Sequence, residues 1–201
     1  LFRTLRTNIR FLQPAKETSS VILVTSSVNG EGKSYVAANL AISQTLLDKK
    51  VVLVDLDIRK PILATSFDLS SQGCLTSYLA DESYSIEDTI IKSSIKNLDI
   101  IPAGIIPPNP SELLQSDRLD ALLEELRQRY DYIILDSAPT AIVSDTFLLS
   151  RIADLTIFVT RANYTTFDLI DSINQTHKQN RLPKMVAVLN GVKQKQTVYS
   201  Y

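Results

Sequence analysis

A short stretch near the start of the chain, SVNGEGKS at residues 27–34, combines glycines with a lysine and a hydroxyl residue. This combination is typical of loops that bind phosphate groups, which follow the pattern G-x-x-x-x-G-K-[ST]. Ser27 stands where the pattern has its first glycine. The position then requires a backbone conformation that a residue other than glycine can adopt. We interpret the stretch as a working variant of the loop, because its G-x-G-K-S ending is too specific for an ordinary glycine-rich turn before a helix.

Four further positions of the loop have a chemical role in this interpretation. Gly30 and Gly32 let the backbone approach phosphate oxygens without an intervening Cβ atom. Backbone N–H groups would surround the β- and γ-phosphates, and the start of the following helix would add favourable partial charge. Lys33 would bridge the two phosphates, and the Ser34 hydroxyl would be a ligand of Mg²⁺.

Carboxylates follow two further apolar runs. VVLVDLDIRKP delivers Asp55 and Asp57 at the end of a predicted strand, and YDYIILDSAPT delivers Asp136 in the same way. Residues i and i+2 of a strand point to the same side, so Asp55 and Asp57 are predicted to face one site at the carboxyl edge of a parallel sheet. One could bind the metal or its water, while the other accepts a proton from an attacking hydroxyl. The alternative for all three is a solvated aspartate at a strand end.

Short β-branched runs alternate with longer helical patterns, which predicts βαβ units. The expected fold is a single doubly wound α/β domain with a mostly parallel sheet, of the P-loop NTPase type. Several runs are apolar almost throughout, as strands covered on both faces are. The predicted strands are residues 19–27, 49–57, 98–103, 130–138, 153–162 and 184–192.

Helices are predicted at residues 33–48, 111–129, 144–151 and 166–180. Leucines recur at helical spacing through 111–129, and Ser111 is the predicted N-cap after a proline-rich segment. A further helix is predicted at 1–14, where apolar residues form one stripe and Arg3, Arg6 and Arg10 form another. The arginine stripe is interpreted either as a solvated face or as a surface that contacts an acidic patch on a neighbouring copy.

The overall composition gives no sign of a nucleic-acid-binding, disulfide-stabilised or membrane-spanning protein. The chain has 201 residues, 44% of them apolar, and a formal net charge of −1, so nothing in its overall charge indicates nucleic-acid binding. The single cysteine, Cys74, cannot form an internal disulfide and favours a reducing compartment. No apolar run reaches the roughly 18–20 residues of a membrane-spanning helix, so this fragment is predicted to be soluble. The chain begins at Leu1 rather than Met, and we interpret it as part of a longer protein.

The combination of NGEGKS, LVDLDIRKP and YIILDSAPT resembles the bacterial tyrosine kinases (BY-kinases), which use a ParA/MinD-like P-loop fold. The resemblance runs almost from end to end. It includes FRTLRTN at 2–8, AGIIPPNPSELLQS at 103–116 and SDTFLLSRIADLTIFVTRANYTT at 144–166. The P-P-N-P-x-E-L-L part is highly specific, because no simple physical rule would assemble it by chance.

The resemblance implies a role for each matching residue. Lys33, Asp55 and Asp57 become the catalytic residues, with Asp55 activating the tyrosine hydroxyl. Ser34, Asp57 and Asp136 become the Mg²⁺ site, with Asp136 as the Walker B carboxylate. The implied ATP-binding residues are Ser27, Val28, Asn29, Gly30, Glu31, Gly32, Lys33, Ser34, Tyr35 and Asn190. Asn190 matches a position that contacts adenine in related ATPases, although a turn asparagine before Gly191 is the alternative.

The family's implied activity is ATP-dependent autophosphorylation of tyrosines in the carboxyl-terminal tail of a neighbouring subunit, in control of capsular or exopolysaccharide synthesis and export. Here the tail at 193–201 carries Tyr199 and Tyr201. Arg3 and Arg6 match an E-x-x-R-x-x-R subunit-contact motif for ring-like self-association, which makes 1–14 an oligomerisation helix. Its glutamate would precede Leu1. Further implied partners are a membrane-embedded activator, fused or separate, and a cognate tyrosine phosphatase. The implied location is the cytoplasmic face of the plasma membrane.

Two other functions remain open at this point. One is a ParA/MinD-like ATPase switch, whose loop normally carries a signature lysine that reaches across a dimer. Val28 occupies that position here, so the cross-dimer mechanism lacks its key residue. The other is a nucleotide-binding regulator without efficient catalysis, which Lys33, Asp55, Asp57 and Asp136 argue against.

Overall fold

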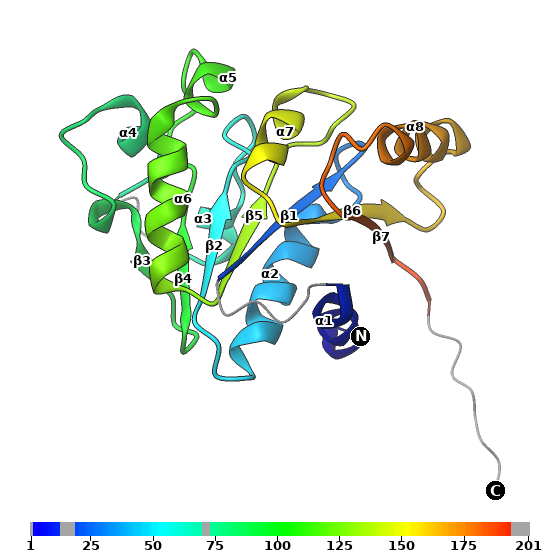
Figure 1. Ribbon diagram of the computed structural model, residues 1–201, viewed down its shortest axis with the longest axis horizontal. Helices are drawn as coiled ribbons and strands as arrows, with labels where there is room; N and C mark the ends of the chain where they lie inside the picture. The colour runs from blue at the N-terminus through cyan, green and yellow to red at the C-terminus, as the bar shows by residue number, and fades with distance from the viewer. Residues whose placement is uncertain (1, 13–18, 70–72, 194–201) are drawn as a thin grey trace, which may run out of the picture.

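The computed structural model describes residues 2–12, 19–69 and 73–193, which contain one seven-stranded sheet (Figure 1). The strand order is β3-β4-β2-β5-β1-β6-β7, and every neighbouring pair is parallel except β3 with β4. The strands are β1 (Ser20–Ser26), β2 (Val51–Asp55), β3 (Ile91–Lys92), β4 (Leu98–Ile101), β5 (Tyr132–Asp136), β6 (Leu155–Arg161) and β7 (Met185–Asn190). β1 lies inside the sheet between β5 and β6, so later parts of the chain add strands on both sides of it.

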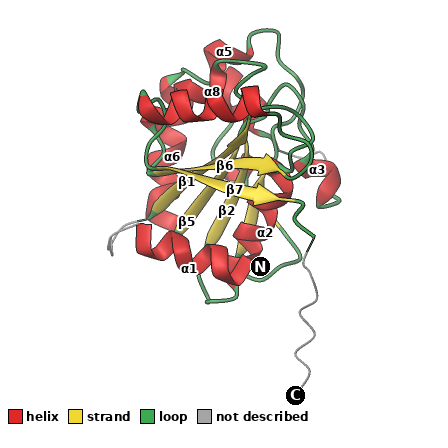
Figure 2. Cartoon of the chain, turned by 90° about the vertical axis from the view of Figure 1, so that its right-hand side faces the viewer, coloured by secondary structure: helices red, strands yellow, loops and turns green. Residues whose placement is uncertain are grey.

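Helices cover both faces of the sheet. Figure 2 shows α1 (Phe2–Leu12) and α2 (Lys33–Thr45) on one side, with α6 (Asp117–Arg129) and α8 (Phe167–Lys178) on the other. Shorter helical segments lie in the connections: α3 (Leu63–Ser66), α4 (Leu75–Ala80), η1 (Glu87–Thr89), α5 (Pro110–Leu113), α7 (Asp145–Leu148) and η2 (Leu149–Arg151).

The core divides into two layers because strand side chains alternate between the faces of the sheet. In β1, Ile22 and Val24 pack with α2, whereas Val21 and Leu23 pack with the leucines of α6. All four side chains are fully buried. This two-sided burial is the physical reason that the strands are apolar along their whole length, and it confirms the predicted doubly wound α/β fold.

The predicted strands are present, but one predicted helix is wrong. Residues 111–129 form two helices rather than one, because Ser116 has an extended conformation at φ −71° and ψ 147° and begins α6 as its N-cap. Ser111 is not an N-cap: Asn109 precedes α5, and Pro110 takes the first helical position. The leucines keep a helical pattern because both helices bury them in the same core. Periodicity did not predict α3, α4, η1 or β3.

Helix α1 packs beside α2 through fully buried Ile9 and an edge-to-face contact between Phe2 and Tyr35, with ring centroids 5.9 Å apart. The Arg6 guanidinium donates a hydrogen bond to the Ser43 carbonyl, whereas Arg3 is exposed. The two arginines of the predicted contact motif therefore differ in environment, and of the two only Arg3 can reach another molecule without exchanging this hydrogen bond. In the part of the chain that the structure describes, no helix combines the length and hydropathy that crossing a bilayer requires.

Candidate functional site

The glycine-rich loop lies between β1 and α2, at the carboxyl edge of the sheet. Gly30 and Gly32 have φ angles of 85° and 96°, in the region that favours glycine. Ser27 is buried and is not among the residues with positive φ, so its side chain imposes no backbone strain. The loop thus has glycine where its conformation requires glycine, and the substitution at Ser27 is accommodated.

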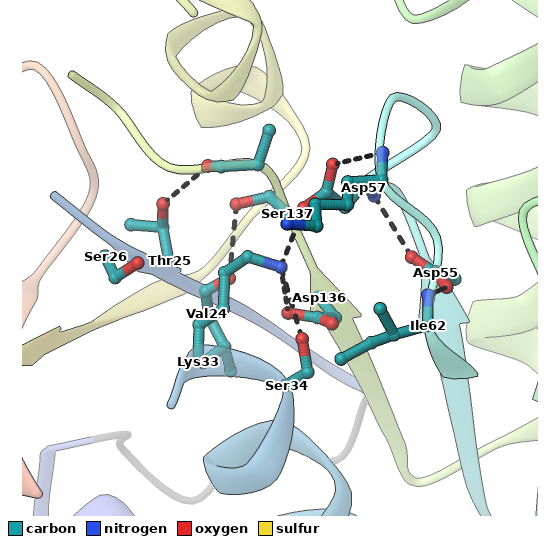
Figure 3. Close-up of polar contacts among 12 residues, drawn as sticks. Val24, Thr25, Ser26, Lys33, Ser34, Asp55, Asp57, Ile62, Asp136 and Ser137 are labelled. Carbon is teal, nitrogen blue, oxygen red and sulfur yellow. Dashed lines mark hydrogen bonds and ion pairs between the residues drawn. The ribbon is translucent and has the colours of Figure 1, made fainter. Parts of the chain in front are cut away.

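Lys33 lies at the centre of a cluster of carboxylates (Figure 3). Its Nζ atom is 2.8 Å from Asp57 Oδ2 and 3.4 Å from Asp136 Oδ1, and it donates to Ser34 Oγ at 3.2 Å. Burial acts to lower the pKa of Lys33, but Asp136 and Asp57 outweigh it and raise the pKa above its usual value. The lysine therefore carries its charge at neutral pH, as contact with phosphate oxygens would require.

Asp136 is fully buried at the end of β5, directly beside Asp55 on β2 in the strand register. Burial raises the pKa of Asp136 despite the opposing charge of Lys33. Its second oxygen, Oδ2, is buried without a hydrogen-bond partner among the described residues. A buried carboxylate oxygen with spare acceptor capacity, next to the Ser34 hydroxyl, fits a site for Mg²⁺ and its bound water.

The described residues contain no group of three or more His, Cys, Asp or Glu placed to hold a metal ion by themselves. This agrees with Mg²⁺ chemistry at nucleotide sites, where one or two protein ligands are completed by phosphate and water oxygens.

Asp55 has the environment of a general base. It is fully buried, and burial together with the neighbouring Asp136 raises its pKa from the ordinary 3.8 to about 7. Its Oδ1 accepts the Asp57 N–H at 3.2 Å, and its Oδ2 accepts N–H groups of Ile62 and Leu63 at 3.3 and 3.2 Å. These bonds fix the carboxyl group in place, and a pKa near the working pH is the value that proton transfer favours.

The position of Asp57 corrects one part of the sequence prediction. β2 ends at Asp55, so Asp57 lies beyond the strand and does not follow its alternation. Asp57 reaches the site because the chain turns there: its Oδ1 accepts the Lys60 N–H at 3.1 Å, and its Oδ2 meets Lys33. The carboxylates of Asp55 and Asp57 thus lie in the same region, although only Asp55 belongs to the strand. Asp57 contacts Lys33, whereas Asp55 is hydrogen-bonded to the backbone N–H groups of Ile62 and Leu63.

The raised pKa of Asp55 predicts a pH-dependent stability. Between about pH 4 and pH 7 the unfolded chain has released this proton while the folded chain retains it, so the free energy of unfolding falls as pH rises through this window. Asp55→Asn removes this contribution. The free energy of unfolding of the variant relative to the natural chain should therefore rise from about pH 5 to about pH 8, by an amount on the order of 2 kcal/mol. Thermal melts of both chains measure it, and a constant difference would contradict the assignment.

The P-P-N-P-x-E-L-L segment contacts this region through a polar network that the sequence did not reveal. Arg59 Nε is 2.8 Å from Asp145 Oδ2, and Ser111 Oγ donates to Asp145 Oδ1 at 2.7 Å. Arg59 also donates to Ser111 Oγ at 3.1 Å. Asp145 is buried, so the network joins the segment after Asp57, helix α5 and helix α7 at the carboxyl edge of the sheet. Only the sequence proximity of Arg59 to Asp57 was a signal for it.

Four further residues of the predicted site remain to be placed: Asn190, Tyr35, Tyr199 and Tyr201. Asn190 ends β7, and its Nδ2 atom donates to the Glu31 carbonyl at 3.0 Å, so it lies against the phosphate loop. Tyr35 is exposed on α2, next to Ser34. Tyr199 and Tyr201 lie outside the described residues.

The sequence predicts that Tyr164, like several other tyrosines, is a core, strand or loop residue without a role in the site. The structure instead places its hydroxyl on the loop, where it donates to the Asn29 carbonyl at 2.9 Å.

Known proteins resemble this chain over most or all of its length. A family model described as an AAA domain matches residues 19–185. The chain is 37% identical over 201 residues to the tyrosine-protein kinase YwqD of Bacillus subtilis (strain 168), covering 100% of this chain and 84% of that protein. It is 32% identical over 200 residues to the tyrosine-protein kinase etk of Escherichia coli (strain K12), covering 99% of this chain but spanning only 27% of that longer protein.

Among solved structures, the kinase domain of Escherichia coli tyrosine kinase ETK matches with a TM-score of 0.89 at 32% identity, covering 100% of this chain and 78% of that one. The septum site-determining protein MinD of Pyrococcus horikoshii, solved with Mg-ADP, shares the fold at a TM-score of 0.68 and 20% identity, over 85% of this chain and 70% of that one. Since the similarity to YwqD extends over the whole chain and its motifs converge on one site, this chain belongs to the bacterial tyrosine-protein kinases.

Proposed function

We propose that the chain is an ATP-dependent protein-tyrosine autokinase, which transfers the γ-phosphoryl group of ATP to Tyr199 and Tyr201 of neighbouring copies. The observation that carries this proposal is Asp55: a buried carboxyl group with a pKa of about 7, fixed by three backbone N–H groups, beside the cluster around Lys33. A hydrolase needs only to orient water, whereas a kinase gains from a base that takes a proton from the acceptor hydroxyl.

In this mechanism the loop N–H groups hold the β- and γ-phosphates, and Lys33 exchanges its carboxylate contacts for phosphate oxygens. Asp55 accepts the proton of the tyrosine hydroxyl, whose pKa is about 10 in free tyrosine, as the new bond forms. Ser34, Asp57 and Asp136 would hold Mg²⁺, directly or through water. When bound, Mg²⁺ supplies charge neutralisation on the phosphates. Asn190 would approach the adenine from the end of β7.

The resemblance of the sequence motifs to the bacterial tyrosine kinases supports a wider role for the protein. We propose self-assembly into a ring through Arg3 and Arg6, so that each tail reaches a neighbouring site. We further propose work at the cytoplasmic face of the plasma membrane with a membrane-embedded activator, opposed by a tyrosine phosphatase, in capsular or exopolysaccharide production. Each phosphate brings about −1.5 to −2 charges, so phosphorylated tails would repel one another and loosen the ring.

Incubation with ATP and Mg²⁺ tests the proposal, followed by an anti-phosphotyrosine blot and mass spectrometry of the tail. We expect phosphate on Tyr199 and Tyr201, with or without a fragment of the activator. The rate of phosphotyrosine formation per molecule should rise with protein concentration, because transfer between two copies requires that they meet. ATP hydrolysis without phosphotyrosine would favour the ATPase switch, a function that Val28 in place of the signature lysine already disfavours.

A further inference from the structure

Three successive carbonyl groups of the phosphate loop each accept a hydrogen bond from a different side chain. The Asn29 carbonyl accepts the Tyr164 hydroxyl at 2.9 Å, and the Gly30 carbonyl accepts Arg161 Nη1 at 2.8 Å. The Glu31 carbonyl accepts Asn190 Nδ2 at 3.0 Å. Arg161 is the last residue of β6, and Tyr164 lies in the turn after it. Asn190 is the last residue of β7. We call Arg161, Tyr164 and Asn190 the loop clamp.

The clamp determines where the loop's N–H groups point. In a trans peptide the C=O group of one residue and the N–H group of the next point in opposite directions. Carbonyls held on the clamp therefore direct the N–H groups of Gly30, Glu31 and Gly32 away from it. Gly30 and Gly32 have positive φ while Asn29 and Glu31 do not, and this alternation is the pattern that gathers successive N–H groups into a concave anion site.

A second connection fixes the loop from within. The Glu31 side chain is fully buried, and its Oε2 accepts the Val28 N–H at 2.8 Å across the loop. Its Oε1 accepts the Thr165 hydroxyl, and Thr165 Oγ1 in turn accepts the Arg161 N–H at 2.8 Å. A buried carboxylate is stable only when hydrogen bonds replace its hydration. The Thr165 hydroxyl thus joins the carboxylate that closes the loop to the segment that carries the clamp.

We propose that Tyr164 and Thr165 are positioning residues for the phosphate site: through the Asn29 carbonyl and the Glu31 carboxylate they hold the loop N–H groups in the direction that a diphosphate needs. They act through the loop backbone rather than by touching the nucleotide base. The inference rests on the proposed ATP site, but it concerns binding and does not require phosphoryl transfer.

Binding of magnesium pyrophosphate and of Mg-ADP, measured by calorimetry, tests it with Tyr164→Phe and Thr165→Val. Each variant removes one hydroxyl and keeps the shape of the side chain. We expect each variant to weaken both ligands by the same factor: about fivefold for Tyr164→Phe, as loss of one hydrogen bond would, and more for Thr165→Val, which loses two. Thr165→Ser keeps the hydroxyl, so its affinity for both ligands should stay within about twofold of that of the natural chain. Tyr84→Phe, a change at a half-exposed tyrosine elsewhere, is the matched control and should change nothing.

In a kinase assay the same variants should raise KM for ATP while kcat changes less than about twofold, because the reacting groups are unaltered. Weaker Mg-ADP binding with unchanged pyrophosphate binding would overturn the proposal and make Tyr164 a contact of the base. Unchanged affinity for both ligands would overturn it as well. If the chain proves to have no kinase activity, the pyrophosphate titration still decides the question, so the two proposals fail separately.

Discussion

Lys33→Met is expected to reduce tyrosine phosphorylation by about 1000-fold, the largest effect of any single substitution in this chain. Methionine keeps the length of the side chain but removes the only charge that balances the Asp57 and Asp136 carboxylates within the described cluster. The phosphoryl group in transfer then lacks its cationic partner. The initial rate of phosphotyrosine formation at saturating Mg-ATP measures the effect.

Loss of folding must be separated from loss of chemistry in this experiment, because the Lys33→Met change would leave buried carboxylates unpaired. Circular dichroism melts on the same sample make the distinction. Lys96→Met is the matched control: Lys96 is highly exposed and pairs only with exposed Asp48 among the described residues, so the change should leave the rate unaltered. A folded Lys33→Met chain that kept a tenth of the activity would exclude the assigned role.

Asp55→Asn is expected to lower the rate by about 100- to 1000-fold and to remove an acid limb from the pH profile. With a pKa of about 7, Asp55 is half protonated near neutrality, so kcat/KM of the natural chain should rise about tenfold per pH unit below pH 7 and level off above it. The amide cannot accept the tyrosine proton at any pH. The Lys33→Met chain, which carries an intact tail, serves as a common phosphate acceptor for both enzymes.

Asp57→Asn provides the comparison that separates base from metal ligand. Asp57 contacts Lys33 beside the proposed Mg²⁺ position, so raised Mg²⁺ should restore part of the activity of this variant. The same Mg²⁺ concentration should not restore the activity of Asp55→Asn. Rescue of Asp55→Asn alone would reverse the two assignments, and rescue of both variants would exclude Asp55 as the base.

The parts of the site that were predictable from sequence are those determined by neighbouring residues. Val21 to Val24 and Val51 to Val54 are apolar on both faces because helices cover both sides of the sheet, which predicts parallel strands. Parallel strands end at one edge, so Asp55 and Asp136 are expected to meet, and they lie side by side in the register. Gly30 and Gly32 have the positive φ angles that the loop pattern implies.

What the sequence could not predict depends on contacts between distant residues or on a single dihedral angle. Tyr164 and Asn29 are separated by 135 positions, and no local pattern associates a tyrosine after a strand with a loop carbonyl so far away. The network of Arg59, Ser111 and Asp145 joins three connections that periodicity does not position. The break in the helix at 111–129 depends on the extended conformation of Ser116, while the leucine pattern continues across it.

The interior position of β1, between β5 and β6, also constrains how the chain folds during synthesis. β1 is made early, but its neighbours in the sheet are β5 and β6, which are made late. Until Leu155–Arg161 has left the ribosome, one edge of β1 has no partner and exposes backbone groups that other chains could pair with. Pairing of such distant strands is slow, because the intervening chain must first be ordered. The phosphate loop, which follows β1 and is held by residues after β6, therefore reaches its final shape only when most of the domain has been translated.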